Sequence, residues 1–330
     1  MTSEVAVAGG GSRSSSGRSA GRAGSPGARS RGARPRGVDP ADPRLAPAVV
    51  AQWRAVADAV DALGAGALAA PSALAGWTVA DLVMHVARSA AALTEALSAP
   101  TPAGAQTDAV GYLTGTGARA EAIAEQARAL AREVTGDGVT ADELTADEVT
   151  ADEVMADEVR TDEAVGGAAG EAGARAVRQR LRGEVEAAAA ALDQLGASWA
   201  DRLVATPGGA MRLGEFLLTR AVEGVVHGLD LGVDPVRDAL RVVVRLFTAA
   251  LAERAPGRSV ELRVPPFAAV QLVEGPRHTR GTPPNVVEAD PVSFVLVASG
   301  RLAWEDAVAD GRLTASGERA DLRAHLPLLR

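Results

Sequence analysis

The feature that most restricts the fold of this chain is its shortage of aromatic side chains. Four Trp, four Phe and one Tyr are present in 330 residues, although 47% of the residues are hydrophobic. The interior must therefore be built from Ala, Leu and Val, and this composition favours helices that pack closely through small side chains. The length leaves room for about two domains of ~150 residues each.

Apolar residues at helical spacing predict five helices in the first two thirds of the chain. Thr78 followed by Asp81 is the pattern of a capping box, which predicts a helix start just after Trp77. The five predicted helices span residues 46–63, 78–96, 118–134, 174–195 and 213–231.

The pattern changes after Asp238. One helix is predicted up to Ala252, and short runs rich in β-branched residues follow it, separated by Gly and Pro. These runs predict strands at residues 260–264, 268–273 and 294–297. We therefore expect a helical domain at residues 45–235 and an α+β domain at residues 236–330.

Two segments do not fit this pattern. Residues 1–44 are rich in Arg, Gly and Ser, and such a composition buries too little apolar surface to offset the entropy of ordering. Residues 140–164 consist of five copies of a five-residue unit, and the five copies together contain ten acidic residues. A five-residue period carries its apolar members around a helix instead of along one face. We expect residues 1–44 to be a disordered tail and residues 135–170 to be a disordered acidic insertion.

Composition also excludes several classes of function. The chain contains no Cys, which excludes disulfides, thiolate metal ligands and a nucleophilic thiol of its own. It has no apolar run long enough to span a membrane and no signal-peptide pattern, so we expect a cytoplasmic protein. The net charge of −8 reflects the acidic repeat, and the Arg-rich tail lacks interleaved aromatic residues. We therefore expect no nucleic-acid partner, and the sequence identifies no specific protein partner.

Only four His are present, and two of them fall on predicted helices with apolar neighbours. Glu223 and His227 are four residues apart, so they share one helix face. His85 lies in the middle of another predicted helix. Two imidazoles and one carboxylate match a zinc site that keeps a position open for a further ligand. The alternative is a buried structural His and an ordinary Glu–His surface pair, and spacing alone does not decide between the two.

A family resemblance supports the metal hypothesis. LAGWTVADLVMHVAR (74–88) together with TRAVEGVVHGLDL (219–231) resembles the DinB-like four-helix bundle of the mycothiol-dependent maleylpyruvate isomerase family. The resemblance implies that His85, Glu223 and His227 bind a divalent metal, usually zinc. It also implies that Asp230 takes the place of the acidic residue that often follows the His, where it can support His227.

The last part of the chain resembles a bacterial sterol-carrier-protein-like domain. The segments that carry this resemblance are EGPRHTRGTPPNVVEAD (274–290) and ASGRLAWEDAVADGRLTASG (298–317). The first segment gathers Arg277, His278 and Arg280 beside two Pro, which predicts an anion site for a substrate or thiol cofactor. The alternative is a solvated polar loop. The expected fold is thus a DinB-like four-helix bundle followed by a sterol-carrier-like α+β domain.

Two functions from different classes follow. A bound metal can activate a low-molecular-weight thiol brought in from outside, of the mycothiol type, which would make the protein an isomerase or an S-transferase for a small electrophilic substrate. The alternative is a non-enzymatic carrier of lipid or another apolar ligand, with a metal-stabilised helical domain. Fold resemblance does not choose between these functions.

Overall fold

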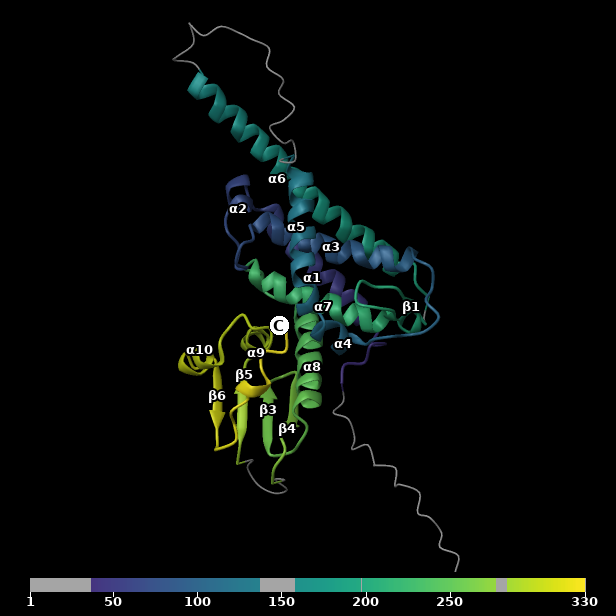
Figure 1. Ribbon diagram of the computed structural model, residues 1–330, viewed down its shortest axis with the longest axis vertical. Helices are drawn as coiled ribbons and strands as arrows, with labels where there is room; N and C mark the ends of the chain where they lie inside the picture. Colours follow the sequence, from purple (N-terminus) through teal and green to yellow (C-terminus); the bar gives the residue numbers. More distant parts are fainter. Residues whose placement is uncertain (1–36, 137–157, 197, 277–283, 330) are drawn as a thin grey trace, which may run out of the picture. The chain divides into compact units, whose positions relative to one another are not determined.

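A computed structural model describes residues 37–136, 158–196, 198–276 and 284–329, with side chains from residue 170 onward in the second range. Within these residues, a helix-rich part extends to the end of α7, and an α+β part begins at α8 (Figure 1). The fold class predicted from the sequence, helical followed by α+β, is therefore confirmed.

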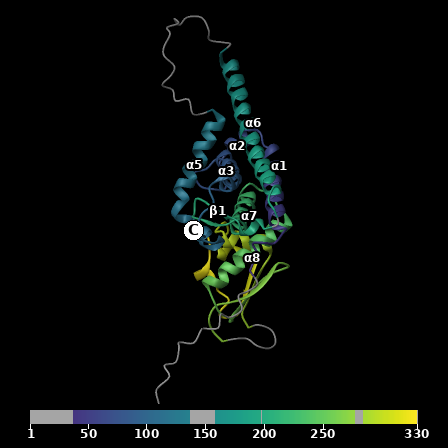
Figure 2. The same ribbon diagram turned by 90° about the vertical axis from the view of Figure 1, so that its right-hand side faces the viewer.

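Four long helices of the first part form a closed ring of neighbours. α1 (Leu45–Asp61) contacts α6 (Glu158–Asp193) and α7 (Leu213–Asp230), and α3 (Val79–Ser98) contacts the same two helices. α5 (Ala120–Thr135) packs against α3 and α6 (Figure 2). The shorter elements are α2 (Ala65–Ala69), α4 (Ala109–Thr114), the 3-10 helices η1 (Gly117–Arg119) and η2 (Trp199–Asp201), and a two-stranded sheet of β1 (Leu203–Val204) and β2 (Met211–Arg212).

Small residues let α7 approach α1 closely, as the composition predicted. A Cβ atom added to Gly224 would lie 3.1 Å from Cγ of Gln52, and one added to Gly228 would lie 2.9 Å from Nε2 of Gln52. Trp53 fills the adjacent space and is fully buried. Both glycines directly follow a candidate metal ligand, so the close contact with α1 fixes the position of the ligand-bearing helix.

The α+β part contains one mixed four-stranded sheet. The strand order is β4 (Ala268–Leu272), β3 (Val260–Val264), β5 (Val286–Ala289) and β6 (Leu313–Ser316). β3 pairs antiparallel with β4 and parallel with β5, and β5 pairs antiparallel with β6. α8 packs on β4 and on α9 (Figure 1). The helices of this part are α8 (Arg237–Arg254), α9 (Pro291–Ala298), α10 (Trp304–Ala309) and the 3-10 helix η3 (Arg323–His325).

The prediction of a strand at residues 294–297 is wrong, because these residues lie in α9. Asp290 caps the helix by accepting hydrogen bonds from the backbone N–H of Val292 and Ser293, and Pro291 occupies the first turn. The run is apolar on all sides and almost wholly buried, so periodicity does not distinguish a strand from a helix here. The cap and the burial together outweigh the β propensity of Val and Phe.

The predicted loop at residues 135–170 also needs correction, because α6 begins at Glu158 and not near Ala174. The segment from 137 to 157 lies outside the described residues. Nucleating a helix is costly, but extending an existing one is cheap, and residues 158–173 include four Ala and three Glu, which favour a helix, beside four Gly, which do not. The later half of α6 is held by packing, because Val177, Leu181 and Val185 are fully buried and the helix contacts α1 and α3.

The helical part and the α+β part are joined by packing and by a hydrogen bond between a backbone N–H and a side chain. α8 contacts both α1 and α7. The fully buried Gln52 on α1 accepts a hydrogen bond from the backbone N–H of Val236 at 2.8 Å, just before α8 begins. Within the described ranges, no helix is both long and apolar enough to cross a membrane.

The capping box at the start of α3 gives a first prediction. Thr78→Ala removes the hydroxyl that accepts a hydrogen bond from the backbone N–H of Asp81. We expect the free energy of unfolding to fall by about 1 kcal/mol, measured by urea denaturation of the full chain. Thr114→Ala serves as the control, because that hydroxyl is exposed and bonds only backbone carbonyls within its own helix. An equal loss in both variants would contradict the capping role.

Candidate metal centre

The capping box sets the register of α3 and with it the position of His85. Thr78 and Asp81 bond reciprocally, since a carboxylate oxygen of Asp81 accepts from the backbone N–H of Thr78 at 2.8 Å. His85 follows Thr78 by seven residues, which is two helical turns. Its ring packs edge-on against Trp77, with 5.6 Å between the ring centroids. Trp77, just before the helix start, therefore also contacts the imidazole.

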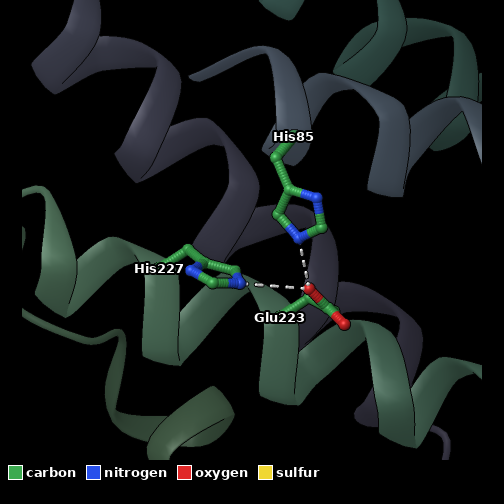
Figure 3. Close-up of side chains that lie close together, drawn as sticks. All are labelled: His85, Glu223 and His227. Carbon is green, nitrogen blue, oxygen red and sulfur yellow. Dashed lines mark hydrogen bonds and ion pairs between the residues drawn. The ribbon is translucent and has the colours of Figure 1, made fainter. Parts of the chain in front are cut away.

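The structure brings His85, Glu223 and His227 together (Figure 3). Nε2 of His85 lies 2.9 Å from Oε2 of Glu223, and Nε2 of His227 lies 3.3 Å from the same oxygen. The two imidazole rings stand nearly perpendicular, with 4.7 Å between their centroids. All three side chains are largely buried, with 13 to 15% of their surface exposed. Two helices that are distant in the sequence thus point three donor groups at one place.

The other nitrogen of His227 is held by Asp230. Nδ1 of His227 lies 2.9 Å from Oδ2 of Asp230, whose side chain is 3% exposed. Arg301 in turn donates to both carboxylate oxygens of Asp230 at 3.0 Å through Nε and Nη2. Asp230 therefore has the supporting position expected from the sequence. Arg301 is a residue that the sequence analysis did not assign.

The pKa values of the cluster show how its charge is shared. Burial raises the pKa of Glu223, but hydrogen bonds with His227 and His85 outweigh it and hold this pKa well below its usual value. Burial lowers the pKa of His227, but hydrogen bonds with Asp230 and Glu223 raise it to about 9. Burial lowers the pKa of His85 and prevails over Glu223. The pKa directions therefore favour a charged Glu223 and a charged His227, and a neutral ring at His85.

This donor set fits a divalent cation. The ligand atoms of the three residues all lie within 4.8 Å of one another, and ligands bound at about 2 Å to one tetrahedral zinc are roughly 3.3 Å apart. Because Asp230 holds Nδ1 of His227, Nε2 is the nitrogen that remains for a metal. A cation here would replace the proton between His227 and Glu223 and would compensate a buried negative charge.

Two cavities meet at the cluster, and both are lined by His85, Ile123 and Glu223. One, of about 230 Å³, extends past Trp77 and His227 towards the α+β part. Its walls there include Ser299, Arg301 and Leu329. The other, of about 150 Å³, extends along α3 and α5 and is lined by Tyr112 and by Arg88, Arg119 and Arg220.

Arg277, His278 and Arg280, the anion site expected from the sequence, lie outside the described residues. The guanidinium groups that line the described cavities come instead from α3, η1, α7 and the turn after α9. The Gly300–Arg301 turn belongs to the C-terminal resemblance, but the ion pair with Asp230 depends on the contact between the two parts of the chain. Only the tertiary structure reveals this ion pair between Arg301 and Asp230.

Two family models match the chain. Residues 49–142 match the mycothiol maleylpyruvate isomerase N-terminal domain, and residues 236–328 match the bacterial SCP ortholog family. Both resemblances are confirmed. The first match contains His85, whereas Glu223 and His227 lie beyond its end on α7. The second match contains Arg301.

Solved structures of the mycothiol-dependent maleylpyruvate isomerase are similar to this chain at low identity. One is 19% identical with a TM-score of 0.46, and a single-residue mutant is 18% identical with a TM-score of 0.45. Each similarity covers 83% of this chain and 92% of the other chain. A comparison with curated proteins finds no significant match.

Removing one donor tests the cluster. We expect His227→Ala to lose the divalent metal that the wild-type chain retains after dialysis, because two remaining donors hold a cation much more weakly than three. Elemental analysis of the purified full chain measures the metal content. His325→Ala, which lies outside the cluster, should retain the wild-type content. Equal metal in wild type and His227→Ala would contradict the assignment.

A substitution at Asp230 tests whether its hydrogen bond with His227 contributes to metal binding. Asp230→Asn keeps the shape but removes the charge that holds Nδ1 of His227 and pairs with Arg301. We expect the metal affinity to fall by about 10- to 100-fold, measured by competition with a chromophoric chelator. Asp234→Asn on the exposed loop that follows α7 is the matched control. An unchanged affinity in Asp230→Asn would mean that the hydrogen bond does not tune the site.

Proposed function

We propose that this protein binds a divalent metal, zinc in the simplest case, through His85, Glu223 and His227. We further propose that it catalyses a thiol-dependent reaction of a small electrophile, as a mycothiol-type isomerase or S-transferase. The observation that carries the proposal is the convergence of two imidazoles and a carboxylate on one point at the junction of two cavities. The family match at residues 49–142 supports the choice of thiol chemistry.

The thiol must come from outside, because the chain has no Cys. When bound, the metal lowers the pKa of a thiol beside it, so that the thiolate is available at neutral pH. The residues of the chain itself position the metal ligands. Asp230 and Arg301 hold the His227 ring in place, and Trp77 packs against the His85 ring. These contacts hold the two imidazole rings in position.

Two adjoining cavities suit a reaction between two molecules. The thiol and the electrophile can approach the cluster from different sides, because each cavity has His85 and Glu223 in its wall. In an isomerisation, the sulfur adds to one end of a double bond, the remaining single bond rotates, and the sulfur leaves again, so the thiol is regenerated. In a transfer, the carbon–sulfur bond stays, and either the carbanion formed by addition takes up a proton or a leaving group departs from the carbon with the electrons of its bond.

The charge of the cavities favours an enzyme over the apolar-ligand carrier. Arg88, Arg119 and Arg220 line one cavity and Arg301 lines the other. Guanidinium groups are poor walls for a lipid chain, because contact with hydrocarbon removes part of their hydration. They suit a small polar or anionic substrate.

Turnover in the presence of a defined thiol tests the proposal. We expect the metal-loaded chain to convert maleylpyruvate, the substrate named for the similar solved structures, only when mycothiol is added. A panel of other unsaturated carboxylic acids should be assayed in parallel, since a transferase would form a stable adduct. Chelation of the metal, or His227→Ala, should abolish the rate.

The surface variant Arg132→Gln is the control for general damage, because Arg132 forms an exposed ion pair with Glu125 away from the cluster. Thiol-independent conversion, or equal rates with and without metal, would contradict the proposed chemistry. Co-purified lipid with no turnover of any electrophile would favour the carrier.

A further inference from the structure

The larger cavity at the cluster has walls from both parts of the chain. Beyond the cluster itself, the walls from the helical part are mostly apolar, as at Leu113 and Val226. The α+β part contributes Ser299, Arg301 and Leu329. The space beside the metal donors is therefore bounded on one side by side chains that belong to the α+β part.

Polar contacts fix two of the three side chains from the α+β part. Arg301 donates to both carboxylate oxygens of Asp230 at 3.0 Å. The hydroxyl of Ser299 donates to the backbone carbonyl oxygen of Leu296 at 3.3 Å, and Ser299 is buried. Leu329 is apolar, so a substitution there changes the volume of the cavity without removing a side-chain hydrogen bond. Among the three, it is the side chain that contributes by its size alone.

Hydrogen bonds hold the backbone that carries Leu329. Nη1 of Arg254, the last residue of α8, donates to the carbonyl oxygen of Pro327 at 2.7 Å. The backbone N–H of Leu328 donates to the carbonyl oxygen of Ala298, the last residue of α9, at 2.8 Å. The side chain of Leu328 is buried. The segment is thus tied to the ends of two helices, and these contacts set the position of Leu329 in the cavity wall.

The turn after α9 packs against the same segment. Gly300 has a φ of 77°, in the left-handed region that favours glycine, and a Cβ atom added to it would lie 3.4 Å from Cβ and Cγ of Pro327. The next residue is Arg301, which pairs with Asp230. One turn therefore positions the charged wall of the cavity and also contacts the segment that supplies the apolar wall at Leu329.

We infer that Leu329 is a specificity-determining residue, which limits the size of the group that can reach the metal cluster through the larger cavity. The inference rests on the proposed function, because it assigns this cavity to a ligand of the metal. An isobutyl group in the wall of a cavity of about 230 Å³ leaves room for a small or slender group beside the donors. A bulky group overlaps with the wall, and overlap in a packed space is unfavourable even when the added atoms are apolar.

A pair of metal ligands that differ only in bulk tests the inference without any need for turnover. The cobalt(II)-loaded full chain is titrated with 1-methylimidazole and with 1-benzylimidazole, and binding is followed in the visible spectrum. Leu329→Ala should bind 1-benzylimidazole at least about tenfold more tightly than the wild type does, because the truncation relieves a steric overlap. Its affinity for 1-methylimidazole should stay within about twofold of the wild type, because the smaller ligand meets no overlap.

Two further variants locate the effect. Leu329→Trp should weaken the binding of 1-methylimidazole by about tenfold or more, because the larger side chain fills the space beside the donors. Leu326→Ala is the matched control, since it makes the same truncation in the same segment at a side chain that does not line the cavity. All three variants should hold as much cobalt as the wild type. If Leu329→Ala leaves the affinity for 1-benzylimidazole unchanged, or Leu326→Ala raises it equally, the inference is wrong.

This test separates the inference from the proposed function. The imidazole probes need no thiol, so a size limit set by Leu329 can hold even if thiol-dependent turnover fails its own assay. If the wild type holds no cobalt, the proposed metal site fails, and access is measured on the metal-free chain by acylation with diethyl pyrocarbonate and peptide mass spectrometry. His227 lines only the larger of the two cavities, whereas His85 lines both and serves as the internal reference. Relative to His85, His227 should react faster in Leu329→Ala and more slowly in Leu329→Trp. Equal ratios in the wild type and both variants would overturn the inference.

Discussion

Glu223 is a carboxylate buried among helices, and the rest of the site is arranged around it. A buried negative charge is costly unless it is paired and hydrogen-bonded. Here one oxygen faces Nε2 of both His85 and His227, and the other faces the guanidinium of Arg220 at 3.8 Å. The low pKa of Glu223 follows from these neighbours, which outweigh its desolvation. A cluster that holds a charged carboxylate between two imidazoles already provides the donors of a metal site.

The fold holds these donors in place from several directions. The capping box at Thr78 and Asp81 sets the register of α3, and the close contact of Gly224 and Gly228 with α1 fixes α7. The α+β part also supports the site through a side chain of its own. Arg301 pairs with Asp230, which in turn holds His227. The C-terminal part therefore reaches the cluster through two hydrogen-bonded contacts, and the two family matches meet at one site.

How much of this the sequence could predict depends on the range of the interaction. Helix periodicity, the capping box and the i,i+4 pair of Glu223 and His227 are local patterns, and the structure contains all three. The approach of His85 to that pair is not local, and it was predicted through the family resemblance. Arg220, Arg119 and Arg301 were not singled out, because an Arg in a sequence looks the same whether it faces solvent or a cavity. The run at 294–297 was misassigned because an all-apolar segment has no periodicity to distinguish a strand from a buried helix.

The most direct test of the central claim, that the three donors hold a metal with a position open to an external thiol, is the absorption spectrum of the cobalt(II)-loaded chain. We predict visible bands of a bound, low-coordinate cobalt ion and a new near-ultraviolet sulfur-to-cobalt band when thiol is added. His227→Ala should show neither. A spectrum identical to that of free aqueous cobalt, or a bound-cobalt spectrum that does not change with thiol, would contradict the account.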